Sequence, residues 1–166
     1  MTTAAAMHYT TIDSPIGRLL LAGDATTLRL LWFVEGRQVA TPDPAWIEAP
    51  AAFREVTAQL TAYFAGRLRV FDVPVDPGGT PFQSRVWRAL QDIPYGETES
   101  YGALARRLGD PKAVRAVGLA NGANPISIII PCHRVIGSNG ALIGYGGGLP
   151  TKRSLLSLEQ GQRALL

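Results

Sequence analysis

The 166-residue chain is divided near its middle by residues 76–80, Asp-Pro-Gly-Gly-Thr, where proline and glycine cluster and the hydrophobic periodicity stops. We therefore predict an N-terminal domain in residues 1–76, a linker in residues 77–80 and a C-terminal domain in residues 81–166. A chain of this length suits one ordinary domain or two small ones. With 46% hydrophobic and 17% charged residues, it has the composition to build a core.

The N-terminal half has the pattern of a scaffold. Runs of β-forming residues parted by turns predict a small antiparallel meander, and apolar residues at helical spacing predict a helix that Gly66 stops. The strands are expected at residues 8–13, 19–21 and 28–33, the helix at 51–64 and a further strand at 70–75. This half contains no phosphate-binding loop, paired-carboxylate motif or nucleophile.

The C-terminal half opens with helix signals. Thr80, followed by proline, is an N-cap candidate for a helix over residues 81–90. Ser100 can cap a second helix over residues 101–108, and residues 109–111 (Gly-Asp-Pro) would end that helix, cap a third and start it. Two helices joined by so tight a turn indicate a helix-turn-helix motif or, more commonly, an ordinary αα-hairpin.

The third helix, predicted over residues 111–123, carries unusually small side chains. It contains four alanines besides Gly118 and Gly122, although an interior glycine costs about 1 kcal/mol relative to alanine. A helix with side chains is about 10–12 Å across, whereas the minor groove of DNA is about 6 Å wide. A helix with small side chains could therefore lie against a minor groove. Close packing inside the protein is the alternative, and Lys112 and Arg115 favour nucleic acid.

The rest of the chain leads into and away from a bend. Asn124 precedes a proline, which ends the helix, and its side chain can bond backbone groups on both sides. Residues 141–145 predict a short strand, and residues 146–148 (Gly-Gly-Gly) a mobile or close-approach loop. Residues 150–158 predict a final helix with Glu159 at its end.

The single cysteine, Cys132, follows an apolar run and a proline, and His133 follows it directly. A lone free cysteine is usually buried and inert. A reactive one needs a base, because only a few per cent of a free thiol is thiolate at neutral pH. Since neighbouring strand residues point to opposite faces, contact between Cys132 and His133 needs a bend or a bridging water. A histidine base also needs an orienting partner, and spacing cannot choose among the carboxylates of this half, which are Asp92, Glu97, Glu99, Asp110 and Glu159.

The charge is uneven along the chain. Residues 1–80 hold 6 Lys/Arg and 8 Asp/Glu, whereas residues 81–166 hold 10 Lys/Arg and 5 Asp/Glu. The basic excess lies in the half that carries Cys132, which suits a polyanion such as nucleic acid. A chance bias of the solvated surface would look the same.

Several classes of protein are disfavoured. One cysteine excludes an internal disulfide and a zinc site built on several cysteines, and the presence of only two histidines, His8 and His133, disfavours a His-rich metal site. The first residues do not resemble a secretory signal, and no stretch approaches the roughly 18 apolar residues of a membrane span. A lone thiol fits a reducing compartment. We expect a cytoplasmic protein without a metal.

The residues around Cys132 resemble a known family. Residues 131–135 (Pro-Cys-His-Arg-Val) are similar to the active-site motif of the O6-alkylguanine-DNA alkyltransferases, or methylated-DNA–protein-cysteine methyltransferases. The resemblance covers about residues 8 to 160. Its further motifs are residues 14–17, 95–96, 101–102, 115–118, 124–125, 144–148, 152–153, 155–156 and 159.

The resemblance implies a fold and an activity. The fold is a two-domain α/β protein, with a small ribonuclease-H-like sheet domain and a winged helix-turn-helix-like domain that binds the minor groove. The activity is DNA repair by irreversible, self-inactivating transfer of the alkyl group of O6-alkylguanine, and also of O4-alkylthymine, from double-stranded DNA to the protein. The target base is flipped, no cofactor is needed, and a monomer is expected.

The resemblance also implies residue roles. Cys132 resembles the alkyl acceptor, His133 the base that activates it through a water, and Glu159 the carboxylate that orients His133. Asn124 resembles the residue that braces the turn. The carbonyl groups of Cys132 and Val135 would read the guanine edge.

Further implied roles concern the leaving base and the DNA. The region of Tyr145 would stabilise the leaving O6, and Lys152 would help to protonate or position the base. Tyr101 resembles the residue that rotates the phosphate and donates to the flipped guanine. Arg115 resembles a finger that fills the gap in the duplex, with Ala116 and Gly118 on the same DNA-binding helix.

Two departures from the family pattern matter. The chain lacks the N-terminal cysteine and histidine ligands of a zinc site that some relatives have. Ser127 and Ile143 lie near the pocket at positions where relatives vary, and a bulky Ile143 disfavours large adducts such as O6-benzyl. Two other functions remain open, a non-catalytic lesion-binding helix-turn-helix protein and a cysteine hydrolase.

Overall fold

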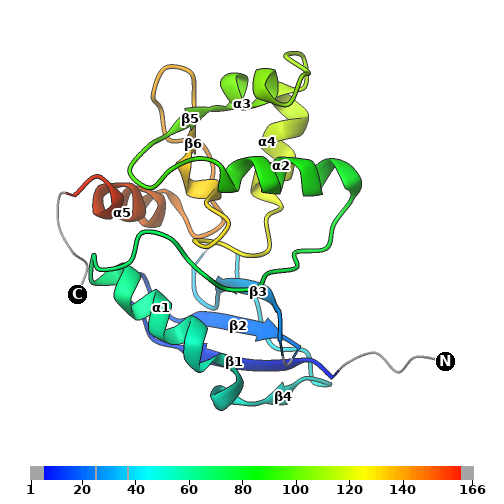
Figure 1. The fold of residues 1–166 in the computed structure, drawn as a ribbon, viewed down its shortest axis with the longest axis vertical. Helices are drawn as coiled ribbons and strands as arrows, with labels where there is room; N and C mark the ends of the chain where they lie inside the picture. Colours follow the sequence, from blue (N-terminus) through cyan, green and yellow to red (C-terminus); the bar gives the residue numbers. More distant parts are fainter. Residues whose placement is uncertain (1–5, 25, 37, 162–166) are drawn as a thin grey trace.

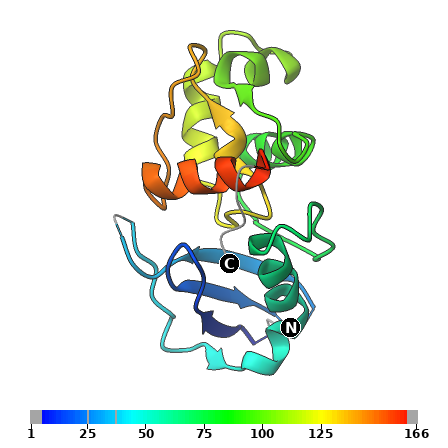
Figure 2. The same ribbon diagram turned by 90° about the vertical axis from the view of Figure 1, so that its left-hand side faces the viewer.

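A computed structural model describes residues 6–24, 26–36 and 38–161. Figures 1 and 2 show two parts, one above the other: a sheet with one long helix below, and a mainly helical part above. The division predicted at residues 77–80 falls in a stretch without helix or strand that leads into the upper part. None of the helices in the described ranges is long and apolar enough to cross a membrane.

The lower part is a four-stranded sheet in the order β3-β2-β1-β4. The strands β1 (His8–Ile12), β2 (Leu19–Gly23) and β3 (Leu28–Phe33) form the predicted antiparallel meander. The all-buried β2 lies between its two neighbours, as its unbroken apolar sequence favours. A two-residue strand, β4 (Ile47–Glu48), pairs parallel to β1 and was not predicted, because two residues carry no periodicity.

The predicted helix of the lower part is confirmed, with a tighter beginning. A 3-10 turn, η1 (Pro50–Phe53), leads into α1 (Arg54–Phe64), which lies against the sheet (Figure 1) and buries its apolar side. Gly66 follows with a positive φ of 77°, which suits a glycine at a helix stop. The strand predicted at residues 70–75 is wrong. Only Val75 forms a bridge, to Leu28, because this stretch includes a proline without a donor.

The upper part contains the predicted helices. α2 (Pro81–Gln91) begins with a full capping box, in which Thr80 and Gln83 exchange hydrogen bonds. α3 (Tyr101–Arg107) begins at Ser100, whose hydroxyl accepts from the Ala103 amide. Both caps were predicted because they depend on neighbouring residues alone.

The start of the next helix differs from the prediction. α4 (Val114–Gly122) has Ala113 as its N-cap, and no side chain caps it. Asp110 instead accepts the Ala113 amide through its backbone carbonyl and closes a turn. The linking turn is therefore longer than the sequence suggested. α3 and α4 pack against each other, as a helix-turn-helix requires.

The last elements surround Cys132. A 3-10 turn, η2 (Cys132–Arg134), leads into β6 (Val135–Ile136), which pairs parallel to β5 (Glu99–Ser100). The last helix of the described residues is α5 (Leu149–Glu159). The strand predicted at residues 141–145 is wrong, since this stretch forms an irregular loop that turns at glycines with positive φ.

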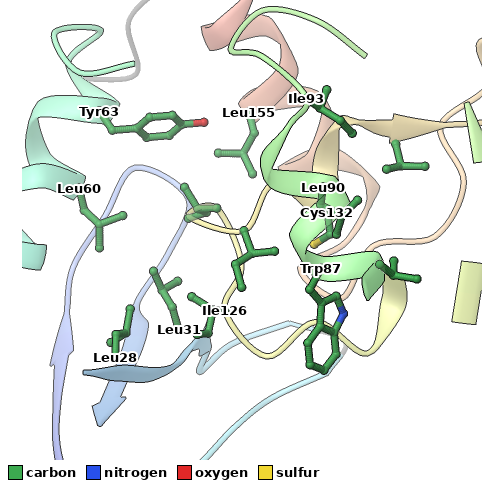
Figure 3. Close-up of a cluster of buried hydrophobic side chains, with 14 of the residues drawn as sticks. Leu28, Leu31, Leu60, Tyr63, Trp87, Leu90, Ile93, Ile126, Cys132 and Leu155 are labelled. Carbon is green, nitrogen blue, oxygen red and sulfur yellow. The ribbon is translucent and has the colours of Figure 1, made fainter. Parts of the chain in front are cut away.

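One hydrophobic core joins the two parts. The Leu31 amide of β3 donates to the Pro125 carbonyl at 3.0 Å, and the Ser127 amide donates back to the Leu31 carbonyl at 3.1 Å. In Figure 3, Leu31 of the lower part and Ile126 and Cys132 of the upper part belong to one buried cluster. The segment before Cys132 is thus fixed from both sides.

Candidate active site

Asn124 braces the approach to Cys132. Its side-chain amide donates to the carbonyl groups of Ile126 and Ile130 at 3.2 and 2.8 Å, and its oxygen accepts the Ile126 amide at 3.0 Å. Within this approach Ile128 has a φ of 73°, which is costly for a β-branched residue. The bonds of Asn124 hold the strained turn in place.

A sharp bend places Cys132 and His133 on one turn. Pro131 precedes the 3-10 turn, and the Cys132 amide donates to the Ile130 carbonyl at 2.8 Å. The two side chains therefore do not follow the alternation of a strand, which was the obstacle seen in the sequence. Both residues are buried, with Cys132 only 4% exposed.

The buried carboxylate of Glu159 is the partner of His133. Its Oε2 lies 2.7 Å from His133 Nε2, and Arg134 donates to both of its oxygens from Nε and Nη2 at 2.7 and 3.1 Å. The hydroxyl of Tyr63, from α1 of the lower part, donates to Oε2 at 2.6 Å. Of the five carboxylates that the sequence left open, the structure brings Glu159 to His133.

Two residues of this cluster were not predicted to act there. Arg134 lies inside the motif, but an exposed DNA-facing arginine would look the same in the sequence, whereas here its Nη1 donates to the buried Ile93 carbonyl at 2.7 Å. Tyr63 occupies an apolar position of a helix, so nothing distinguished it from core. Only the fold joins α1 to the end of α5.

The cluster fixes the protonation of both partners. Burial opposes the charge of Glu159, but hydrogen bonds from His133 and Arg134, together with the positive charges of Arg134 and of His133 when it is protonated, lower its pKa to about 2. Burial lowers the pKa of His133 and outweighs the attraction of Glu159. Because a carboxylate can only accept, the proton of neutral His133 sits on Nε2. Its Nδ1 has no hydrogen-bond partner among the described residues and can accept a proton.

The Cys132 thiol is not activated by its surroundings alone. Burial raises its pKa, while the side chains of Asn124 and Ser127 and the charge of Lys152 act in the opposite direction. The thiol therefore needs a base, as the sequence indicated.

Lys152 ties together the chain segments after Cys132. Its buried Nζ donates to the Val135 carbonyl at 2.6 Å and to the Ile143 carbonyl at 3.0 Å. Burial lowers its pKa to about 8. Lys152 thus joins β6 to the irregular loop before α5.

A cavity of about 820 Å³ opens beside α4. Such a volume is within the range of small-molecule sites. Its lining includes four residues of the predicted substrate and DNA sets, namely Tyr101, Arg115, Gly118 and Tyr145. Ala116 lies exposed on the same helix but does not line the cavity. Asn121, also in the lining, donates from Nδ2 to the Cys132 carbonyl at 3.3 Å and links the cavity wall to the cysteine.

The glycines of α4 do not serve tight internal packing. A Cβ at Gly122 would meet nothing within 4 Å, and one at Gly118 would make only ordinary contact, at 3.8 Å, with the Tyr101 ring. Leu119 on the same helix is 72% exposed. The small residues therefore present a slim surface outward.

The glycines before α5 allow the backbone to lie close against side chains of the sheet. A Cβ at Gly146 would collide with the Trp32 ring and one at Gly147 with the Phe33 ring, both on β3. The ring of Tyr145 packs edge-on against Phe33 with centroids 5.9 Å apart. The lower part therefore supports the loop that carries Tyr145 to the cavity.

Comparisons with known proteins assign both parts of the chain to one family. The family model for the ribonuclease-like domain of 6-O-methylguanine DNA methyltransferase matches residues 7–77, and the model for its DNA binding domain matches residues 81–161. The chain belongs to the 6-O-methylguanine DNA methyltransferase family. The expected fold class, a mixed α/β protein with an N-terminal sheet domain and a C-terminal DNA-binding domain, is confirmed.

Relatives in this family cover nearly the whole chain. A methylated-DNA–protein-cysteine methyltransferase of Methanosarcina acetivorans is 54% identical over 92% of this chain and 98% of its own. One of Mycobacterium tuberculosis is 57% identical over 94% of each chain. A crystal structure of Mycobacterium tuberculosis OGT in complex with DNA is 57% identical, with a TM-score of 0.87, and covers 93% of this chain and 94% of that one.

From the hydrogen bonds around Glu159 we predict that this carboxylate makes a pH-dependent contribution to the stability of the fold. Since folding lowers the pKa of Glu159 from 4.5 to about 2, its charge stabilises the fold fully above pH 4.5, and this contribution is lost as the pH falls toward 2. Glu159→Gln should lower the free energy of unfolding by about 3 kcal/mol at neutral pH, because Arg134 loses its buried partner. Urea unfolding from neutral to acidic pH measures the difference between the two proteins.

The difference between wild type and Glu159→Gln should shrink below pH 4.5. Glu97→Gln, at an exposed carboxylate of the same half, is the matched control and should leave stability unchanged. A difference that stays constant down to acidic pH would contradict the ionised, paired Glu159.

Proposed function

We propose that this protein repairs DNA by moving the alkyl group of O6-alkylguanine to Cys132 in a single, self-inactivating turnover. The observation that carries the proposal is the buried hydrogen bond from His133 to Glu159, one residue along the chain from the buried Cys132. A wall residue of the cavity beside α4, Asn121, contacts the Cys132 carbonyl. The names of the relatives, identical to this chain at 54–57% of positions, support the same reaction.

Besides the protein and the lesion, the reaction uses one bridging water. His133 Nδ1 takes the thiol proton through a bridging water, while Glu159 stabilises the imidazolium that forms. The Cys132 sulfur attacks the alkyl carbon, the S–C bond forms, and the C–O6 bond breaks with its electron pair on guanine. Guanine leaves with the proton that His133 accepted. The thioether has no route back to a thiol, so each protein acts once.

The cavity residues handle the base. A target atom inside a duplex is reached by flipping the nucleotide, at a cost of a few kcal/mol. Arg115, exposed on α4, fills the gap in the duplex, while Ala116 and Gly118 let the helix approach the minor groove. Tyr101 assists the flip and contacts the base. The hydroxyl of Tyr145 is buried and has no hydrogen-bond partner among the residues that the structure describes. It stabilises the leaving O6.

The remaining residues position these groups. Asn124 braces the turn before Cys132, and the Val135 carbonyl, held by Lys152, contacts the guanine edge. Ile143, half exposed in the cavity wall, narrows the space for large adducts such as O6-benzyl. O4-alkylthymine is a further substrate. The protein acts as a monomer in the cytoplasm, where a lone thiol stays reduced.

Methyl transfer to the protein tests the proposal. Wild-type protein incubated with a duplex that contains O6-methylguanine should take up at most one methyl group, and the Cys132 peptide should gain the mass of one CH2 group in mass spectrometry. Cys132→Ala should gain nothing but still bind DNA, because α4 is unchanged. An unchanged mass with retained binding would favour a non-catalytic lesion binder. Repeated turnover would favour a cysteine hydrolase.

A second prediction concerns Arg115. Arg115→Ala should slow methyl transfer from a duplex about tenfold, because nothing offsets the cost of flipping, and should leave transfer from the free O6-methylguanine base nearly unchanged. Rates of methyl transfer with both substrates measure this. Arg88→Ala, which removes one exposed positive charge from α2, is the control for net charge. An equal loss on both substrates would refute the gap-filling role of Arg115.

A further inference from the structure

Asn121 lies near the Cys132 carbonyl and Tyr101, two groups that contact the base in the proposed mechanism. It is buried, with 4% exposure, and lines the cavity beside α4. Its Nδ2 donates to the Cys132 carbonyl at 3.3 Å. Burial raises the pKa of the Tyr101 hydroxyl, and the nearby Asn121 side chain acts against this rise. Neither the sequence motifs nor the mechanism above gives Asn121 a role.

The chemistry of the contact fixes the orientation of the Asn121 amide. A backbone carbonyl can only accept, so the group that faces Cys132 must be the NH2 of the side chain. The oxygen, Oδ1, therefore points elsewhere. It has no hydrogen-bond partner among the described residues. A buried acceptor without a donor is costly, and this one belongs to a side chain of the cavity wall.

The alkylated base has few hydrogen-bond donors. In O6-alkylguanine the oxygen is an ether and N1 carries no hydrogen, so N1, N3 and N7 can only accept. N9 is bonded to the sugar. The 2-amino group is the only hydrogen-bond donor that the base can offer to an acceptor in the cavity.

We propose that Asn121 reads the 2-amino group of the flipped base with its Oδ1. This inference rests on the proposed function and names a residue that determines its substrate preference. The same side chain orients the Cys132 carbonyl through Nδ2, as Lys152 orients the Val135 carbonyl. A carbonyl oxygen has two lone pairs, so each carbonyl keeps one for the base. Because the 2-amino group has only two hydrogens, the acceptors at that edge share them, and Asn121 Oδ1 is one of these acceptors.

The proposed role of Asn121 predicts which alkylated bases react fastest. O6-methylhypoxanthine has the same ring and methyl group but no 2-amino group, and O4-methylthymine has no donor on its Watson–Crick edge once alkylated. Both leave Oδ1 unpaired, and unpaired buried polar groups are what make a site reject an analogue. Asn121 therefore favours alkylated guanine over both.

The test compares two lesions in the same duplex. Rate constants for methyl transfer to Cys132 are measured with O6-methylguanine and with O6-methylhypoxanthine, for wild type and for Asn121→Leu, which has a similar volume but no polar group. The ratio of the two rate constants should fall about fivefold in the variant, as expected for the loss of one hydrogen bond. Partial unfolding slows both lesions alike and cancels in the ratio.

The control and the contrary outcomes are distinct. Thr98→Ala, at an exposed residue outside the cavity lining, should keep the wild-type ratio. An unchanged ratio in Asn121→Leu, with or without a slower reaction, would overturn the role of Asn121 and leave the proposed function intact. A wild type that transfers methyl from neither lesion would contradict the proposed function, and the role of Asn121 with it.

Discussion

The buried, ionised carboxylate of Glu159 is the interaction on which the rest of the site depends. It accepts hydrogen bonds from Tyr63 of α1 and from His133 and Arg134 of η2, and it stands at the end of α5. A buried charge is tolerated only when it is paired and fully hydrogen-bonded. The three elements must therefore be in register before Glu159 can stay charged, and only a charged Glu159 fixes the tautomer of His133.

The N-terminal half takes part in the site, although its sequence indicated only a scaffold. Tyr63 reaches the carboxylate, and the rings of Trp32 and Phe33 receive the glycine-rich segment that carries Tyr145. The backbone exchange between Leu31 and the segment around Pro125 also anchors the approach to Cys132. One buried cluster in Figure 3 contains residues of both parts.

The sequence predicted the features that arise from contacts between residues close together in the chain. The caps at Thr80 and Ser100 involve residues three positions apart, and both are confirmed. The strand predicted at residues 141–145 failed because its composition does not reveal that glycines bend the chain there. The partner of His133 could not be chosen by spacing, since Glu159 reaches it only through the packing of α5, and the resemblance to a family supplied it instead. Tyr63, Arg134 and Asn121 were missed because their contacts join distant segments.

The tautomer and charge of His133 test this account most directly. The chain has only two histidines, so nitrogen–proton correlation NMR spectra of wild type and His8→Gln assign the His133 ring without ambiguity. We expect a neutral ring at neutral pH with its proton on Nε2, hydrogen-bonded to Glu159, and the signal of the neutral form should persist as the pH is lowered below the usual pKa of histidine. A ring that is charged at neutral pH, or one with its proton on Nδ1, would contradict the account, because no nitrogen would then be free to take the Cys132 proton.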